Sequence, residues 1–328
     1  MDLRPLELGE LVDRSAGFWR THWKSLFRLY LGFQLVQYVA LRGFELAARA
    51  WFPVLRGGRL TNEAMRGDTE ALVRQLLFAA PAMLALTLLL AVLTHALSVA
   101  GSAYVIPNLL GGTATVGGAI KRMFDRIGAT LGLVGLSIAW FTGWGLLTLL
   151  PAAGLIGATI VVENQGLKAI SLALAMLWLM FATMALVLTY VVRFATAGQV
   201  IAMEEVGALG AYRRSGALSS GTIREGVLGL VKLRLTLIIT VVSVILLVMA
   251  LMGGMPALII QGYYGKVFDP VNADPDAVPQ LLLVPAQLLQ LVVGSLVAPL
   301  YAVTMGWFYV DMRMRREGLD LELKLGPK

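Results

Sequence analysis

Residues 204–221 read EEVGALGAYRRSGALSSG, a short polar stretch that separates two long apolar segments of the chain. It opens with small residues, continues with a basic helical turn at Arg213 and Arg214, and ends in Gly and Ser before the next apolar run. Adjacent charged residues are costly in the hydrocarbon core of a bilayer. We therefore interpret this stretch as a basic helix at the membrane surface, connecting two membrane crossings.

The composition places the whole chain in a membrane. Of the 328 residues, 58% are hydrophobic and only 14% are charged, and the mean hydropathy is +0.77. A soluble domain carries about 25% charged and about 45–50% apolar residues. The apolar residues also occur in runs that can cross a bilayer, which takes about 20 residues. The sequence therefore predicts an all-α, polytopic transmembrane helical bundle.

The apolar runs predict about six spans in a single integral membrane domain over residues 1–328. The first span is irregular, because Arg42, Glu45 and Arg49 lie within it at helical spacing. Either the helix has left the hydrocarbon at these residues, or they form a charged cluster that faces the bundle interior. The predicted spans cover residues 27–54, 76–106, 127–150, 170–202, 227–260 and 281–309, and a cytoplasmic tail follows over 310–328.

Two earlier segments resemble the stretch at 204–221. LGELVDRSAGFWR begins at Leu8 and VGGAIKRMFDRIG begins at Val116, and both are basic and precede an apolar run. The recurrence predicts a threefold pseudo-repeat of a basic surface helix followed by a helical hairpin. Alternatively, membrane loops simply share a composition. The first segment belongs to an amphipathic helix over 5–30, which either lies on the cytoplasmic leaflet or leads into the first span.

The basic residues predict the orientation. With six spans and both termini in the cytoplasm, most of the 27 Lys and Arg residues fall on the cytoplasmic side, as the positive-inside rule requires. The main exceptions lie in 42–74, whose side stays open. The net charge of +7 is then explained by basic residues that contact anionic lipid headgroups, and it does not indicate binding of nucleic acid. The candidates for contact with headgroups or with a partner protein are Arg122, Arg126, Arg213, Arg214, Arg315 and Arg316.

Few residues carry the chemistry of an enzyme. Cysteine is absent, and the sequence has no zinc-protease, serine-hydrolase or P-loop motif. We expect no catalytic residue, cofactor or metal. His95 is an ionisable group near the middle of the second span, and it either relays protons or contacts a substrate, or is a neutral imidazole bonded to a neighbouring helix. Glu163, where the third span meets the outer face, is a second intramembrane polar candidate.

Small residues at intervals of four predict close helix contacts. Gly128 and Gly132 form such a pair in the third span. Pro299 removes a backbone donor in the sixth span and predicts a kink there. The sixth span carries a stripe of small residues on one helix face, which consists of Gly294, Ala298, Ala302 and Gly306. This stripe could serve packing within the chain or dimerisation equally well.

The chain resembles a bacterial membrane protein family over essentially its whole length. The likeness is carried by LRPLELGELVDRSAGFWRTHW at 3–23, ALGAYRRSGALSSG at 208–221 and YVDMRMRREGLDLEL at 309–323. These segments are similar to six-helix proteins of the glycerophosphoryl diester phosphodiesterase membrane-domain family. The resemblance implies an integral protein of the bacterial cytoplasmic membrane. The family name comes from relatives fused to a phosphodiesterase barrel, and we do not expect that activity here, because the spans occupy most of the 328 residues.

Three functions are compatible with these features. The first is a non-enzymatic membrane module that acts as a scaffold or interacts with lipids or a partner protein. The second is a small transporter or lipid-translocating permease, with a path at His95, Glu163 and the proline-containing spans. The third, an enzyme acting on lipid headgroups, ranks last because it needs clustered acid and base groups at one interface.

Overall fold

The computed structural model describes residues 6–51, 69–162, 164–223, 226, 229–266, 268 and 277–319. Every regular element within these ranges is a helix, which confirms the predicted all-α class. The helices, in chain order, are α1 (Leu8–Trp51), α3 (Thr69–Leu109), α4 (Val116–Asp125), α5 (Ile127–Val161), α6 (Gln165–Phe194), α7 (Ala197–Met203), α8 (Ala208–Leu218), α9 (Val231–Tyr264), α10 (Gln280–Val297) and α11 (Pro299–Glu317).

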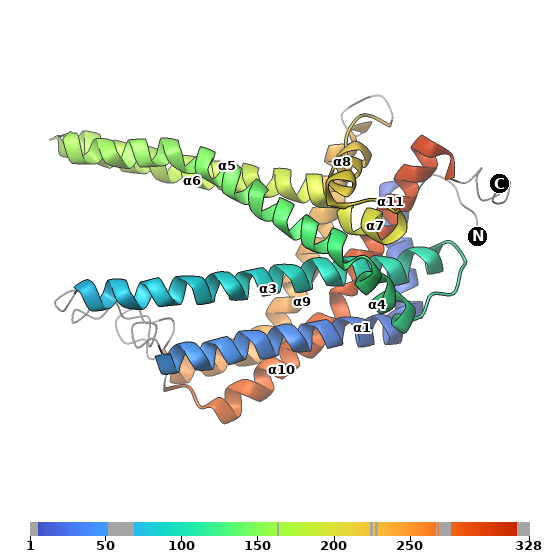
Figure 1. Cartoon of the computed structure of the whole chain (residues 1–328), viewed down its shortest axis with the longest axis horizontal. Coiled ribbons are helices and arrows are strands. Elements are labelled where there is room, and N and C mark those ends of the chain that lie inside the picture. Colours follow the sequence, from blue (N-terminus) through green and yellow to red (C-terminus); the bar gives the residue numbers. More distant parts are fainter. Residues whose placement is uncertain are drawn as a thin grey trace.

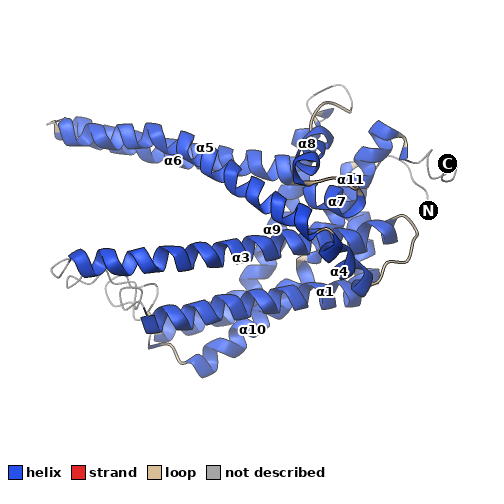
Figure 2. Ribbon diagram, viewed as in Figure 1, coloured by secondary structure: helices blue, strands red, loops and turns tan. Residues whose placement is uncertain are grey.

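Three pairs of long helices run toward one end of the molecule (Figure 1). α5 packs along α6, α9 packs along α10, and α1 lies beside α3. The shorter helices α4, α7 and α8 gather with α11 at the opposite end, as Figure 2 also shows. Leu6 and Leu319 belong to the same core cluster there. We call the end formed by α4, α7, α8 and α11 the closed end, and the end where α5 turns into α6 the open end.

Five helical stretches of the described chain are long and apolar enough to cross a membrane, and they coincide with the second to sixth predicted spans. The first predicted span is not among them. Its apolar run in α1 is interrupted by Gln34, Gln37 and Arg42, which lower its hydropathy. The five stretches are Ala79–Leu109, Ile127–Val161, Gln165–Met203, Val231–Tyr264 and Gln280–Glu317.

The N-terminal region agrees with the alternative in which the amphipathic helix leads into the first span. α1 is one continuous helix of 44 residues, so the predicted helix over 5–30 and the predicted span over 27–54 form a single element within the described residues. Leu11, Ser15 and Leu26 are completely buried, and α1 packs against α3, α10 and α11. The apolar face of residues 8–30 therefore contacts other helices of the protein. Amphipathic periodicity fits contact with protein or with a leaflet, which is why the sequence could not separate the two.

Proline has different effects in two of the spans. α10 ends at Val297 and α11 begins at Pro299, so the helix is interrupted where the missing backbone N–H predicts it. α5, in contrast, continues through Pro151 to Val161, and the third span does not end at residue 150. Residues 310–317, predicted to lie in a tail, continue α11 and are mostly buried.

Polar side chains of α1 point toward α10. Arg42 is largely buried, and it also forms an ion pair with Glu45. This contact agrees with a charged cluster that faces the bundle at these two residues, whereas the side chain of Arg49 lies outside the described part. The contacts between the two helices are Ser295 Oγ to Gln34 Oε1 (2.9 Å), Tyr38 OH to Gln287 Oε1 (3.2 Å) and Arg42 to Gln280.

Some of the predicted small residues lie at close helix contacts. A Cβ atom on Gly132 would lie 2.8 Å from Ala208 Cβ of α8, and one on Gly306 would lie 3.0 Å from Val105 Cγ1 of α3. A Cβ on Gly128 would meet nothing within 4 Å. The stripe of the sixth span therefore contacts other helices of the same chain. Its remaining members are Gly294 beside Gln34, the partly buried Ala298 and the buried Ala302.

Candidate functional site

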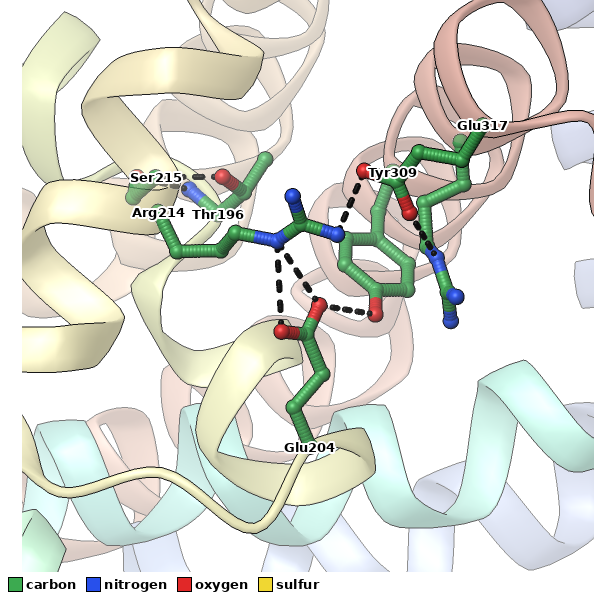
Figure 3. A network of polar contacts seen from close by, with 7 residues as sticks. Thr196, Glu204, Arg214, Ser215, Tyr309 and Glu317 are labelled. Atoms are coloured by element: carbon green, nitrogen blue, oxygen red, sulfur yellow. Dashed lines mark hydrogen bonds and ion pairs between the residues drawn. The ribbon is translucent and has the colours of Figure 1, made fainter.

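A network of ion pairs at the closed end centres on Arg214 of α8 (Figure 3). Its Nε atom donates to both carboxylate oxygens of Glu204, at 3.3 and 3.2 Å, and its terminal nitrogen contacts Glu317 of α11. Glu204 also accepts a hydrogen bond of 2.9 Å from Tyr309 OH, and Arg313 donates to Glu317 at 2.9 Å. The network therefore connects α8, the residue that follows α7, and α11.

The two carboxylates hold Arg214 in its charged form. Burial alone would lower the pKa of this guanidinium, but Glu204 and Glu317 outweigh burial and raise that pKa above its ordinary value. Next to Arg214, the Ser215 hydroxyl oxygen accepts from the N–H and the hydroxyl of Thr196, at 3.2 and 3.0 Å. Because both carboxylates are ion-paired, neither is placed to act as a general base.

A second set of contacts surrounds the buried carboxylate of Asp311 in α11. Asp311 is completely buried, accepts from Arg315 Nε at 3.0 Å, and pairs with Arg234 of α9 at 3.3 Å. It also accepts the backbone N–H of Leu6 at 2.9 Å. The Leu6 carbonyl accepts from Arg234 at 2.6 Å and from Arg315 at 2.7 Å. A buried carboxylate needs such partners, and here they fix the N-terminal segment to α9 and α11.

Five of the six arginines predicted to contact headgroups bind groups of the protein itself. Arg214 and Arg315 belong to the two networks above. Among the residues that the structure describes, Arg213 is the one member of the six without such a contact. The remaining contacts are Arg122 Nε to Ala202 O (3.1 Å), Arg126 to Glu205 (3.1 Å), and Arg316 to the carbonyls of Ala217 and Ser220.

A pocket of about 520 Å³ lies beside Arg213, where α6, α8 and the start of α9 meet. Three cationic side chains from these three helices line it, Arg193, Arg213 and Lys232. We call it the basic pocket. Its described lining contains no acidic side chain, and the rest consists of apolar groups such as Leu188 and Val192 and of several hydroxyls. The arrangement can hold a negatively charged group beside an apolar one.

Sequence reasoning missed two of these three cations as site residues. Arg193 lies toward the end of the fourth predicted span, and Lys232 lies near the start of the fifth. Both lie at the boundary between an apolar run and a polar segment, on the side that Arg213 occupies. That shared boundary was the available signal, but it could not show that three separate helices bring the cations to one pocket.

Three helices bring His95 together with polar partners. His95 Nε2 of α3 lies 3.3 Å from Ser137 Oγ of α5, and Tyr190 OH of α6 donates to the same oxygen at 3.2 Å. These contacts favour the alternative in which the imidazole bonds to a hydroxyl of a neighbouring helix. Glu163, the other intramembrane candidate, lies outside the described residues.

Neither metal ligands nor known relatives assign a function. Within the described ranges, no group of three or more His, Cys, Asp or Glu side chains is placed to hold a metal ion. No family model, curated protein or solved structure matches this chain. The resemblance noted from the sequence therefore stays a prediction, and the function has to be inferred from the residues of the chain.

Proposed function

We propose that the chain is a non-enzymatic membrane module of the bacterial cytoplasmic membrane, and that it acts as a scaffold which gathers anionic lipids. The observation that carries this proposal is the construction of the closed end. The Arg214 network and the Asp311 contacts connect the N-terminal segment, α8, α9 and α11 through buried or half-buried ion pairs. These ion pairs fix the arrangement of the closed end, and the cations that line the basic pocket, Arg193, Arg213 and Lys232, are suited to contact a negatively charged leaflet.

The same proposal includes six spans and both termini in the cytoplasm. α1 supplies the sixth crossing, since 44 residues at about 1.5 Å per residue exceed the roughly 30 Å hydrocarbon core. The pairs α1–α3, α5–α6 and α9–α10 then provide three hairpins, which is the arrangement that the threefold pseudo-repeat predicts. With this topology the basic closed end lies in the cytoplasm, as the positive-inside rule requires.

The arginine contacts of the carboxylates at the closed end support a non-enzymatic role. Glu204, Glu317 and Asp311 each contact at least one arginine. An acid or base catalyst must reach a proton of its substrate, whereas both oxygens of each of these carboxylates already contact donors of the protein. Turnover of any phospholipid by the purified protein would contradict this part of the proposal.

The lipid content of the purified protein tests the scaffold function. The full chain is extracted from bacterial membranes with a mild detergent, and the retained lipids are identified by native mass spectrometry. We expect anionic phospholipids to be enriched relative to the surrounding membrane. Retained lipids with the composition of the bulk membrane would refute the proposal.

A permease is the second candidate, and its motivation is the position of His95 on a long apolar helix, because an ionisable group within a membrane-spanning segment often marks a substrate path. The test is lipid scrambling or small-solute uptake in proteoliposomes. If the chain is a permease, His95→Ala should slow this flux, whereas Thr87→Ala, an exposed position on the same helix, should leave it unchanged. No flux above that of empty liposomes would exclude this candidate.

A further inference from the structure

We propose that the basic pocket binds one anionic phospholipid, with the phosphate among Arg193, Arg213 and Lys232 and the acyl chains along α6 and α9. This inference rests on the proposed lipid scaffold and names its ligand and its site.

The cations come from three helices and converge on one space. Arg193 is in the last turn of α6, Arg213 is in the middle of α8, and Lys232 is in the first turn of α9. Arg193 reaches across to α8, since its Nη1 atom would lie 3.4 Å from a Cβ placed on Gly216. None of the three forms an ion pair with another residue in the described part of the chain. Their charges are therefore available to a phosphate group, which binds Arg and Lys through charge-assisted hydrogen bonds.

One helix end at the pocket also favours an anion, and the C-terminal ends of α6 and α8 are offset by basic residues, with Arg193 in the last turn of α6. Lys232 lies at the N-terminus of α9, the positive end of that helix dipole. The C-terminus of α8 would have the opposite effect, but Arg316 of α11 donates to the carbonyls of Ala217 and Ser220 there. Arg316 thereby offsets the negative end of α8 and leaves the potential of the pocket positive.

The serine and threonine hydroxyls of the pocket are acceptors toward a ligand. Each of these four donates its own proton to a backbone carbonyl, so its oxygen is left to accept a hydrogen bond. A headgroup with hydroxyl donors, such as glycerol, matches this lining better than the methylated ammonium of choline. The hydroxyls and their carbonyl partners are Thr189 with Ala185, Ser219 with Ser215, Ser220 with Ala217, and Thr236 with Lys232.

The apolar side of the pocket continues toward the membrane. Leu188 of α6 is 47% exposed, and Leu237 and Val241 of α9 are 38% and 41% exposed. α6 and α9 touch each other at few positions, so their apolar surfaces can contact a third group between them. A free phosphate would leave these surfaces unused, and an acidic protein segment could not enter the hydrocarbon beside them. An amphiphile with a phosphate head and acyl chains fits both sides.

Binding of defined ligands to the purified full chain tests the site. Native mass spectrometry measures the apparent Kd of phosphatidylglycerol, phosphatidylcholine, inorganic phosphate and glycerol 3-phosphate. We expect phosphatidylglycerol to bind about tenfold or more tightly than each of the others, because the others lack the net charge or the acyl chains. Equal binding of phosphatidylcholine, or of either soluble phosphate, would overturn the lipid assignment, as would displacement of the lipid by a glutamate-rich peptide.

Two matched triple variants locate the site. Arg193→Gln, Arg213→Gln and Lys232→Gln together should weaken phosphatidylglycerol binding about tenfold or more. Lys121→Gln, Lys168→Gln and Lys266→Gln remove the same charge outside the pocket and should change binding by less than about twofold. Equal effects of the two triples, or no effect of the first, would overturn the site. The single variant Lys232→Gln alters an exposed side chain, so the protein should stay folded and still bind about threefold more weakly.

The outcomes separate this inference from the proposed function. If anionic lipids remain enriched in both triple variants, the scaffold function stands and the pocket is wrong. If the wild-type chain retains no excess of anionic lipid, the scaffold function itself fails. Loss of the enrichment in the pocket triple alone supports both.

Discussion

The carboxylate of Asp311 in α11 accepts the backbone N–H of Leu6 at 2.9 Å, although 305 residues separate the two in the sequence. The same carboxylate forms ion pairs with Arg234 and Arg315, which both donate to the Leu6 carbonyl. One buried anion therefore holds two cations and the N-terminal segment in place. This contact explains why the two ends of the described chain meet at the closed end.

Asp311→Asn tests this arrangement. Asparagine keeps the shape and the acceptor for Leu6, but it removes the carboxylate charge that pairs with both Arg234 and Arg315. Removal of one member of a buried ion pair costs about 3–5 kcal/mol, so we expect the free energy of unfolding to fall by about 3 kcal/mol. Denaturant titration in detergent micelles measures it. Asp125→Asn, at an exposed position in α4, is the control and should change it by less than about 0.5 kcal/mol.

Neighbouring arginines on α8 allow a second comparison. Arg214→Lys removes the planar guanidinium group, whose nitrogens contact Glu204 and Glu317 at the same time. We expect the free energy of unfolding to fall by about 1–2 kcal/mol. Arg213→Lys, at the adjacent exposed position, should have an effect of less than about 0.5 kcal/mol. Equal effects of the two substitutions would show that the Arg214 network does not stabilise the closed end.

The pKa of Arg214 determines how the difference in unfolding free energy between wild type and Arg214→Lys depends on pH. Because folding raises this pKa, the stabilisation is fully present below the ordinary pKa of arginine and is lost only as the pH rises through the raised value. Arg214 therefore stays charged in both folded and unfolded chains near neutrality. We expect the stability difference between wild type and Arg214→Lys to be flat from about pH 6 to about pH 9. A slope in unfolding titrations over this window would assign the difference to another group.

The glycine pair of α5 separates packing from helix propensity. A methyl group on Gly132 would lie 2.8 Å from Ala208 Cβ, which cannot rotate away, so Gly132→Ala should destabilise the protein by about 1–3 kcal/mol. Gly128→Ala, one turn earlier, meets no neighbour and should be neutral or stabilising by up to about 1 kcal/mol. Thermal unfolding of both variants measures the contrast. Stabilisation by both would mean that α5 and α8 are farther apart than described.

Local features predicted most of the helices. Apolar length located the second to sixth spans, and the missing N–H of Pro299 located the break between α10 and α11. Pro151 has the same chemistry, but α5 continues through it, because neighbouring turns can absorb one lost hydrogen bond. Whether a proline ends a helix thus depends on surroundings that the local sequence does not contain.

The candidate site was less accessible from the sequence. The arginine positions were recognised as basic, but their partners are distant in the chain, as for Arg122 and the Ala202 carbonyl. A periodic pattern gives the face of a helix and not the residue opposite that face. The same limit hid the meeting of Arg193 and Lys232 in the basic pocket.

Single cysteines can locate the closed and open ends, because the chain contains no cysteine of its own. α5 and α6 have 35 and 30 residues, and at about 1.5 Å per residue each exceeds the roughly 30 Å hydrocarbon core. Their two ends should therefore lie on opposite sides of the membrane. We expect Lys121→Cys, on α4 at the closed end, to react with an impermeant maleimide only in inverted vesicles.

Lys168→Cys and Lys266→Cys should show the opposite pattern and react in intact spheroplasts, because they follow the start of α6 and the end of α9. Labelling of all three cysteines after detergent treatment shows that each thiol is reactive, and the unsubstituted chain gives the background. Reaction of Lys121→Cys and Lys168→Cys from the same side would mean that the α5–α6 hairpin does not cross the bilayer. The basic pocket would then be separated from the leaflet that supplies its lipid.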